Sequence, residues 1–401
     1  MSEVPPLPRQ QGSEDSGPPQ TRSRSIDHDG VYRYANGALL DSILGPPESR
    51  ETMADSLLAG TRPEERRRIA LLVKNLNPTG GNRVILRLFD HLQASPLTEM
   101  HVLVVPETKP HIGALADLIA CKRRYRTAAS VGRAWRPVKP EAFDVVLSTS
   151  RRTLDFVRDF GHPAHVHLLQ AIEAWDTVNS ASFCEFCVER GYPTPEECVD
   201  LVRRIGISHD VWYLDQVAAA GGVLAVSDYL RSAVRYLTGS DDTKVSIPEW
   251  HIKGDARAGD RSIDALFFVR GFGYNGDALA IEVMNAMPPE YRVTVVAARR
   301  ARAEVKAIRR RSGVSIVREP PDAVLAELFA SSRVVVHPSL CNGGGSIPIE
   351  ALALGCSVVA SRTGWLLGTQ SEGPLTIVDR HDPQEYLSTV LRVLAPRGLS
   401  E

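Results

Sequence analysis

Short apolar runs rich in β-branched residues alternate with amphipathic segments along most of the chain. The first run covers residues 69–73, and the segment after Asn82 places apolar side chains three and four positions apart, the spacing of one helix face. Strands that alternate with helices predict parallel sheets with helices on both faces. The expected strands are 69–73, 101–105, 144–147, 166–169, 223–227, 265–269, 293–297, 314–317, 334–336 and 357–360.

The pattern of strand, glycine loop and helix occurs twice, at Gly80-Gly81 and again at 343–345. A polar stretch with glycine and charge, 245–262, suits a linker between the two occurrences. We therefore predict an α/β protein with two Rossmann-like domains that face a cleft. The helices expected between the strands are 84–92, 229–237, 278–287, 301–311, 323–330 and one that begins near Pro348.

The same pattern predicts four segments. Residues 1–66 form an N-terminal extension, and its first ~30 residues are expected to be disordered because Pro, Ser, Gln and charged residues dominate them. A short helix is expected near 50–59. Residues 67–250 form the first Rossmann-like domain and 262–383 the second, and a helix within 384–401 is expected to return to the first domain.

The composition is that of an ordinary globular protein. The 401 residues include 43% hydrophobic and 24% charged residues, and the formal net charge is −1. This balance gives no drive toward nucleic acid or an anionic membrane, and basic runs such as 122–126 are interpreted as solvated helix faces. No apolar stretch has the roughly 18 residues of a bilayer span, and the polar N-terminus lacks the apolar core of a signal peptide. We therefore expect a cytoplasmic protein.

The strongest chemical signal is the segment 332–364, SRVVVHPSLCNGGGSIPIEALALGCSVVASRTG. An apolar strand breaks into a glycine loop, and a helix is expected to open near Pro348 with Glu350 in its first turn. Glycine has no Cβ, so backbone N–H groups can approach a phosphate at this helix start. A carboxylate at Glu350 can accept hydrogen bonds from two vicinal hydroxyls. The residues expected at the phosphate are Gly343, Gly344, Gly345 and Ser346.

This segment resembles the signature of retaining nucleotide-sugar glycosyltransferases of the GT-B fold, group 1 (family four), which usually runs P-S-x-x-E-G-F-G-x-x-x-x-E-A-x-A-x-G-x-P-V-V-A-S. It departs from that pattern at Asn342, where the family has the first Glu of an E-x7-E pair, and at Gly344, where the family has an aromatic residue. The resemblance implies that Glu350 binds the ribose and that Asn342 faces hydroxyls of the donor sugar with less charge stabilisation. The matching residues are Pro338, Ser339, Gly343, Gly345, Glu350, Ala351, Ala353, Gly355, Val358, Val359, Ala360 and Ser361.

Other segments extend the resemblance over residues 67 to about 395. KNLNPTGGNRVI looks like the family's first loop, where Gly80 and Gly81 come close to the donor diphosphate. Phe-Phe-Val-Arg-Gly looks like the start of the nucleotide-binding domain, where Arg270 meets the phosphates. Asn275 stands where many members have Lys or Arg, so the diphosphate is expected to rely on Arg270 and backbone amides. Segment 144–172, with STSRRT and HLLQAIE, resembles a branch that includes bacterial rhamnosyltransferases.

Two polar residues follow a strand of the first domain. Gln170 and Glu173 are expected at the carboxyl end of a parallel strand, where open α/β sheets bind ligands. Gln170 stands about where related enzymes place a histidine at the acceptor cleft, and the alternative is a pair of polar residues at a loop rim. The candidate catalytic residues are therefore Asn342, Gln170 and Glu173.

A cysteine-rich segment offers a zinc site as an alternative. The first two cysteines have the spacing of a zinc ligand pair, whereas the remaining gaps are looser than finger patterns. Phe183 and Phe186 beside them favour core packing, and we expect no metal. The four candidate ligands are Cys184, Cys187, Cys198 and His209.

The resemblance implies a retaining glycosyltransferase of hexosyltransferase type that moves a sugar from a nucleotide-diphosphate sugar to a hydroxyl of a glycan or natural product. No cofactor is expected, and the departing phosphate would take the acceptor's proton. The alternatives are a non-catalytic auxiliary subunit, favoured by Asn342, Gly344 and Asn275, and a GT-B epimerase. The five tryptophans are scattered rather than arranged as a base-stacking platform, so no nucleic-acid partner is expected.

Overall fold

The computed structural model describes residues 37–44, 53–62, 65–74, 80–105, 112–134, 138–157, 162–171, 186, 188–205, 208–240, 244–245, 261–308, 313–341 and 343–395. All of them belong to one compact unit, Tyr34–Glu401. The predicted disorder of the first ~30 residues and most of the predicted linker fall outside the described residues. Within the described ranges, none of the helices combines the length and the apolar content that a bilayer span needs.

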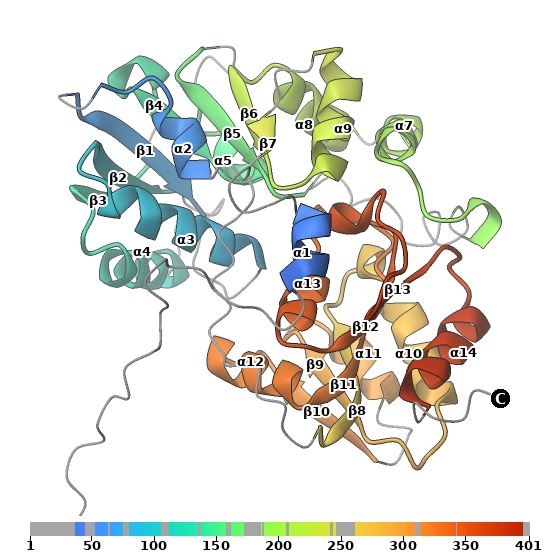
Figure 1. Cartoon of the computed structure of the whole chain (residues 1–401). Helices are drawn as coiled ribbons and strands as arrows, with labels where there is room; N and C mark the ends of the chain where they lie inside the picture. Colours follow the sequence, from blue (N-terminus) through green and yellow to red (C-terminus); the bar gives the residue numbers. More distant parts are fainter. Residues whose placement is uncertain are drawn as a thin grey trace, which may run out of the picture. The chain divides into compact units, whose positions relative to one another are not determined.

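The first sheet has seven parallel strands in the order β3-β2-β1-β4-β5-β6-β7 (Figure 1). The interior strand β1 is apolar and buried from Ile69 to Val73, as expected for a parallel strand covered on both faces. The strands are β1 Arg67–Val73, β2 Thr98–Val104, β3 Ser130–Arg133, β4 Val145–Ser148, β5 His165–Leu169, β6 Gly222–Ala225 and β7 Lys244–Val245.

In the part of the chain that the structure describes, six helices flank this sheet, and two of them, α3 and α9, are the helices that the sequence predicts here. On α3, the buried residues Leu88, Phe89 and Leu92 are spaced as one helix face. At the end of α4, Lys122 and Arg123 are exposed, as expected of a solvated face, and Arg124 is half-buried. The helices are α3 Gly80–Ala94, α4 Ile112–Arg124, α5 Arg151–Leu154, α7 Pro195–Ile205, α8 Ser208–Ala218 and α9 Asp228–Thr238.

The second sheet has six parallel strands in the order β10-β9-β8-β11-β12-β13. Neighbouring residues of β8 enter different cores: Phe267 packs with α10 and α14, and Phe268 packs with α12 and α13. The elements are β8 Ile263–Val269, α10 Asp277–Ala286, β9 Val293–Ala297, α11 Arg302–Ile308, β10 Val314–Arg318, α12 Asp322–Ala330, β11 Ser332–His337, α13 Ser346–Ala353, β12 Ser357–Ser361, β13 Leu375–Val378 and α14 Pro383–Leu394.

The C-terminal helix α14 belongs mainly to the second sheet. It packs against α10 and against β11, β12 and β13. A hydrogen bond of 2.8 Å between the hydroxyls of Tyr386 and Tyr192 links it to the first domain. A return of the chain to the first domain beyond this helix would involve residues 396–401, which lie outside the described residues.

Two short helices of the N-terminal extension pack on different domains. Helix α1, Gly37–Leu44, buries Leu39 and Leu40 against the second domain beside α13. Helix α2, Met53–Leu58, lies against α3 of the first domain, where Arg67 Nη1 donates to the Leu57 carbonyl at 2.6 Å. The helix expected near 50–59 is therefore α2, and the extension contacts both domains.

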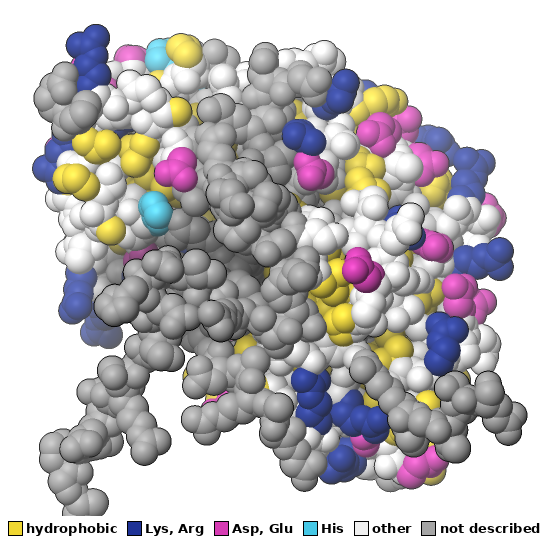
Figure 2. Space-filling model, viewed as in Figure 1, with side chains coloured by type: hydrophobic (Ala, Val, Ile, Leu, Met, Phe, Trp, Pro, Cys, Tyr) yellow, Lys and Arg dark blue, Asp and Glu magenta, His cyan; other side chains and the backbone are white. Residues whose placement is uncertain are grey.

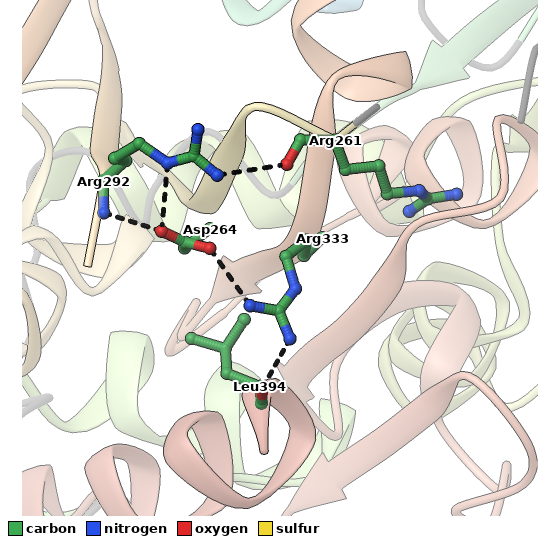
Figure 3. A network of polar contacts seen from close by, with 5 residues as sticks. All are labelled: Arg261, Asp264, Arg292, Arg333 and Leu394. Atoms are coloured by element: carbon green, nitrogen blue, oxygen red, sulfur yellow. Dashed lines mark hydrogen bonds and ion pairs between the residues drawn. The ribbon is translucent and has the colours of Figure 1, made fainter. Parts of the chain in front are cut away.

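A polar network closes the amino-terminal edge of the second sheet (Figure 3). The Asp264 carboxylate accepts a hydrogen bond from the Arg292 amide at 2.8 Å and from Arg333 Nη1 at 3.1 Å. Arg333 also donates to the Leu394 carbonyl at the end of α14, and Arg292 Nη2 lies 3.5 Å from the Arg261 carbonyl. Burial by itself raises the pKa of Asp264, but these hydrogen bonds outweigh it and hold the pKa below its usual value.

The surface agrees with the near-zero net charge. On the face shown in Figure 2, Lys and Arg side chains lie among Asp and Glu side chains. Several ion pairs join exposed partners, such as Arg124 with Asp90 at 2.6 Å, and such pairs contribute little to stability.

Candidate functional site

The glycine loop leads from the carboxyl end of β11 into α13. Gly345 precedes the helix with φ of 62°, a left-handed conformation that glycine adopts without strain. The helix therefore begins at Ser346, before the predicted start near Pro348. Pro348 fits the first turn because backbone N–H groups there have no partner within the helix. The prediction that Glu350 lies in the first turn is wrong, since the early start places it in the second turn.

Two glycines of this region are required by close backbone contacts. A Cβ on Gly343 would lie 2.0 Å from the Gln170 carbonyl oxygen, and Ser227 donates its hydroxyl hydrogen to the Gly343 carbonyl. A Cβ on Gly276, where φ is +72°, would lie 1.8 Å from the Pro338 carbonyl oxygen. The glycine loop therefore packs directly on the end of β5 and on the start of α9.

The Glu350 carboxylate is buried, with 7% of the residue exposed. Arg83 approaches it from the first domain, with 3.8 Å between Nη1 and Glu350 Oε2. The same guanidinium places Nη2 at 2.5 Å from Asp322 Oδ1. Burial raises the pKa of Glu350, and the nearby Arg83 and Arg87 oppose that rise. The site therefore brings together α3, α12 and α13.

Arg270 directly follows β8. It is the second cation of the site and, unlike Arg83, belongs to the second domain. Burial lowers the pKa of Arg270, and so does the neighbouring Arg83, while Glu350 acts in the opposite direction. His337, at the end of β11, has its pKa lowered to about 3 by burial and by Arg270, so it is neutral at pH 7. These groups place two arginines, Arg83 and Arg270, beside the Glu350 carboxylate.

Asp277 holds the turn that carries Arg270. Its carboxylate accepts backbone hydrogen bonds from Arg270 at 3.1 Å, Gly271 at 2.6 Å and Phe272 at 3.2 Å. Burial raises the pKa of Asp277 to about 6 although these amides favour its charged form. Asn275 lies in the same turn, where its backbone N–H donates to the Phe272 carbonyl at 3.0 Å.

Gln170 lies at the end of β5 as predicted, next to Gly343. Its Nε2 is 3.4 Å from the Thr149 carbonyl, and its Oε1 is buried without a hydrogen-bond partner among the described residues. Further back on β5, the buried rings of His165 and His167 contact Ser148 Oγ at 2.9 and 2.8 Å. Burial, together with His165, lowers the pKa of His167 to about 3, so this ring is neutral at pH 7. The network supports the strand end that carries Gln170.

Several predicted residues are not placed by the structure. Asn342, Glu173, Cys184 and Cys187 lie outside the described residues, and the side chain of His209 is not described either. The remaining zinc candidate, Cys198, lies 3.0 Å from Tyr229 Oη and 3.3 Å from Cys341 Sγ. Within the described part of the chain, no group of three or more His, Cys, Asp or Glu side chains is arranged to hold a metal ion.

Three residues at the site are absent from the prediction. Arg83 has a recognisable signal, a cation two positions after a double glycine at a helix start. Asp322 is the first residue of α12, where a carboxylate is common for helix-dipole reasons alone. The Trp365 indole N–H is buried without a hydrogen-bond partner among the described residues, and a Cβ on Gly344 would lie 4.0 Å from it. A buried unpaired donor beside the glycine loop is a candidate ligand contact.

Residues 267–396 match the family described as "Glycosyl transferases group 1". The D-inositol 3-phosphate glycosyltransferase of Acidothermus cellulolyticus is 36% identical over 78 residues, which are 19% of this chain and 17% of that protein. D-inositol 3-phosphate glycosyltransferase 2 of Catenulispora acidiphila is 37% identical over 98 residues, 23% of each chain. The matched stretch thus spans about a fifth of these curated relatives.

Solved structures resemble the chain over most of its length. HepE of Anabaena, crystallised with UDP and glucose, superposes with a TM-score of 0.57 at 15% identity, over 82% of this chain and 90% of that one. Sucrose-phosphate synthase of Thermosynechococcus elongatus gives 0.56 at 16% identity, with the same coverage. The chain therefore has a GT-B-like fold of two Rossmann-like sheets. Within this fold, residues 267–396 are the part that is similar to group 1 glycosyltransferases.

Proposed function

We propose that this protein is a retaining glycosyltransferase that moves a hexosyl group from a nucleotide-diphosphate sugar to a hydroxyl acceptor. The observation that carries the proposal is the buried Glu350 carboxylate, which follows the glycine loop at the end of β11 and faces Arg83. The match of the same residues to group 1 glycosyltransferases supports it.

In this proposal the donor nucleotide binds at the carboxyl edge of the second sheet. Glu350 accepts hydrogen bonds from two ribose hydroxyls, and Arg270 neutralises the diphosphate. The residues proposed to line the phosphates are Gly80, Gly81, Arg270, Asn275, Gly343, Gly344, Gly345 and Ser346. The proximity of Arg83 to Arg270, which lowers the pKa of Arg270, supports an anionic ligand at this position, and HepE, which shares the fold, was solved with UDP.

The acceptor is proposed to bind at the first domain, near Gln170 and Glu173. The buried and unpaired Oε1 of Gln170 is an acceptor atom suited to a sugar hydroxyl. Asn342 is proposed to face the donor sugar. The departing phosphate would take the proton of the attacking hydroxyl, so the reaction requires no dedicated base and no cofactor. Donor groups fixed around the diphosphate would stabilise its developing charge.

The alternative is an auxiliary subunit that binds a nucleotide sugar without turnover. The sequence departures at Asn342, Gly344 and Asn275 favour it. A GT-B epimerase is a third hypothesis. Nucleotide release from the donor, measured with and without an acceptor, separates a transferase from an auxiliary subunit.

A thermal-shift panel of UDP, GDP, ADP and dTDP, each with and without a sugar, tests the proposal. A nucleotide that binds the native state raises the free energy of unfolding by mass action, by about 2.7 kcal/mol at a concentration of 100 Kd, and the melting midpoint rises with it. Including dTDP-rhamnose tests the resemblance to bacterial rhamnosyltransferases. If none of these ligands raises the midpoint of the wild type, the proposed function is wrong.

A further inference from the structure

Arg83 belongs to the first domain but meets acidic groups of the second. It lies on the first turn of α3, and its guanidinium approaches Asp322 Oδ1 at 2.5 Å and Glu350 Oε2 at 3.8 Å. Glu350 is the carboxylate proposed to bind the ribose. The group that this carboxylate faces in the structure is therefore a cation from the opposite domain.

Cations and carboxylates are crowded together at this position, where Asp322 also acts on Glu350 and Asp277 acts on Arg270. Arg83, Arg87 and Arg270 all act on Glu350, and Arg83 also lowers the pKa of Arg270. Cations held close together in a partly buried site repel one another, and an anion placed between them removes that cost. A nucleotide diphosphate supplies such an anion.

The contacts of Arg83 are of a kind that a ligand can replace. The Asp322 side chain is 62% exposed, and an ion pair with such an exposed partner contributes little stability. The distance of 3.8 Å to Glu350 is too long for a hydrogen bond. The Arg83 side chain is itself 21% exposed, so a ligand in solution can reach it.

We propose that Arg83 exchanges its two carboxylate partners for the diphosphate of the donor. This inference rests on the proposed function and adds a residue to it. Before the donor binds, Arg83 pairs with Asp322 and Glu350. When the donor binds, the guanidinium turns to the phosphate oxygens, which it can contact with two parallel hydrogen bonds, and Glu350 is left to accept the ribose hydroxyls. Arg83 thus couples phosphate binding to ribose binding across the two domains.

The test compares ligands that differ only in phosphate content. Calorimetric affinities are measured for a nucleoside, its monophosphate and its diphosphate, using the base that stabilises the wild type most. In Arg83→Gln the diphosphate should bind about 10- to 100-fold more weakly, the loss expected for a hydrogen bond between charged groups, and the nucleoside should bind unchanged. Asp322→Asn is the matched control, because it removes the competing carboxylate and keeps the cation. It should leave diphosphate binding unchanged or tighter.

A structural role of Arg83 would give different results. The inference is overturned if Arg83→Gln loses the same affinity for nucleoside and diphosphate, or loses none. It is also overturned if Asp322→Asn loses as much affinity for the diphosphate as Arg83→Gln. If Arg83→Gln melts below the wild type, Arg83→Lys replaces it. Arg83→Lys keeps the charge but cannot make two parallel hydrogen bonds. Its affinity for the diphosphate should fall about 3- to 10-fold, and its affinity for the nucleoside should not change. If the wild type binds no nucleotide, the proposed function and this inference are both wrong. If the wild type binds nucleotides but the Arg83 substitutions weaken all three ligands equally, only this inference is wrong.

Discussion

Two of the buried carboxylates of the second domain have arginine side chains nearby and lie at opposite edges of its sheet. At the amino edge, Asp264 accepts hydrogen bonds from Arg292 and Arg333 and has a lowered pKa. At the carboxyl edge, Arg83 Nη1 lies 3.8 Å from Glu350 Oε2, which is too far for a hydrogen bond, and the pKa of Glu350 is raised. Hydrogen bonds from Arg292 and Arg333 outweigh the cost of burying the charge of Asp264. The arginines near Glu350 among the described residues do not outweigh the cost of burying its charge. This difference separates a group that holds the fold together from one that is suited to a ligand.

Removal of the Asp264 carboxylate should have the largest effect on stability. Asp264→Ala leaves the Arg292 amide and the Arg333 guanidinium without their acceptor, and we expect the free energy of unfolding to fall by about 2–3 kcal/mol. Urea denaturation measures it. The control is Asp90→Ala, which breaks the exposed pair with Arg124 and should cost less than about 0.5 kcal/mol. Equal costs for the two variants would show that the network does not hold the sheet edge.

Removal of the carboxylate with the raised pKa, Glu350, should affect binding rather than folding. Glu350→Gln should weaken nucleotide binding by about 1.5–3 kcal/mol, the range for a hydrogen bond to a charged group. Its unfolding free energy should stay the same or rise, because a neutral amide replaces a charge that burial disfavours. The exposed Glu327→Gln on α12 is the control for isothermal titration. Wild-type affinity of Glu350→Gln for every nucleotide tested would remove Glu350 from the site.

The two carboxylates should respond to pH in opposite directions. The pKa of Asp264 is lowered from 3.8, so its stabilising contribution is present above that value and is lost as the pH falls through the lowered pKa. The pKa of Glu350 is raised from 4.5, so its relative contribution is favourable below that value and is lost as the pH rises through the raised pKa. As the pH rises from the acid range, the contribution of Asp264 therefore grows while that of Glu350 declines.

Unfolding free energies from pH 3 to 8 for the wild type, Asp264→Asn and Glu350→Gln measure this contrast. The loss of unfolding free energy in Asp264→Asn, relative to the wild type, should become smaller toward acid pH. The unfolding free energy of Glu350→Gln should rise relative to that of the wild type toward neutral pH. Parallel pH profiles for both variants would mean that the two carboxylates have similar environments after all.

Addition of a carboxylate at position 342 should have the smallest effect on binding. Asn342→Glu restores the charge that the group 1 pattern has beside the donor sugar. It should raise turnover roughly tenfold or less, because the added charge acts on positive character that grows only toward the transition state. Donor affinity should change by less than about twofold. Nucleotide release over time measures turnover, with Asn342→Gln as the size-matched neutral control, and equal rates for both variants would place Asn342 away from the sugar.

Local patterns in the sequence predict most of the fold. Central strands such as β1 and β8 are apolar along most of their length, and the helix face of α3 repeats at three and four residues, so neither depends on knowledge of distant contacts. The same patterns do not predict the weakly marked elements. Strands β7 and β13 lie at sheet edges and are short, and α7 opens with a reciprocal cap between Thr194 and Glu197 rather than with an apolar run.

For the candidate site, the sequence by itself determined its chemistry: a glycine loop after a strand, with a carboxylate on the helix that follows. These features are local because they depend on glycine's conformational freedom and on helix geometry. Only the tertiary structure decided which charges meet. It brought Arg83 of α3 to Glu350 of α13, packed Gly343 on Gln170, and gave Asp264 a lowered pKa and Glu350 a raised one. The energy of a charge depends on its burial and on partners far away in the chain, and no local pattern records either.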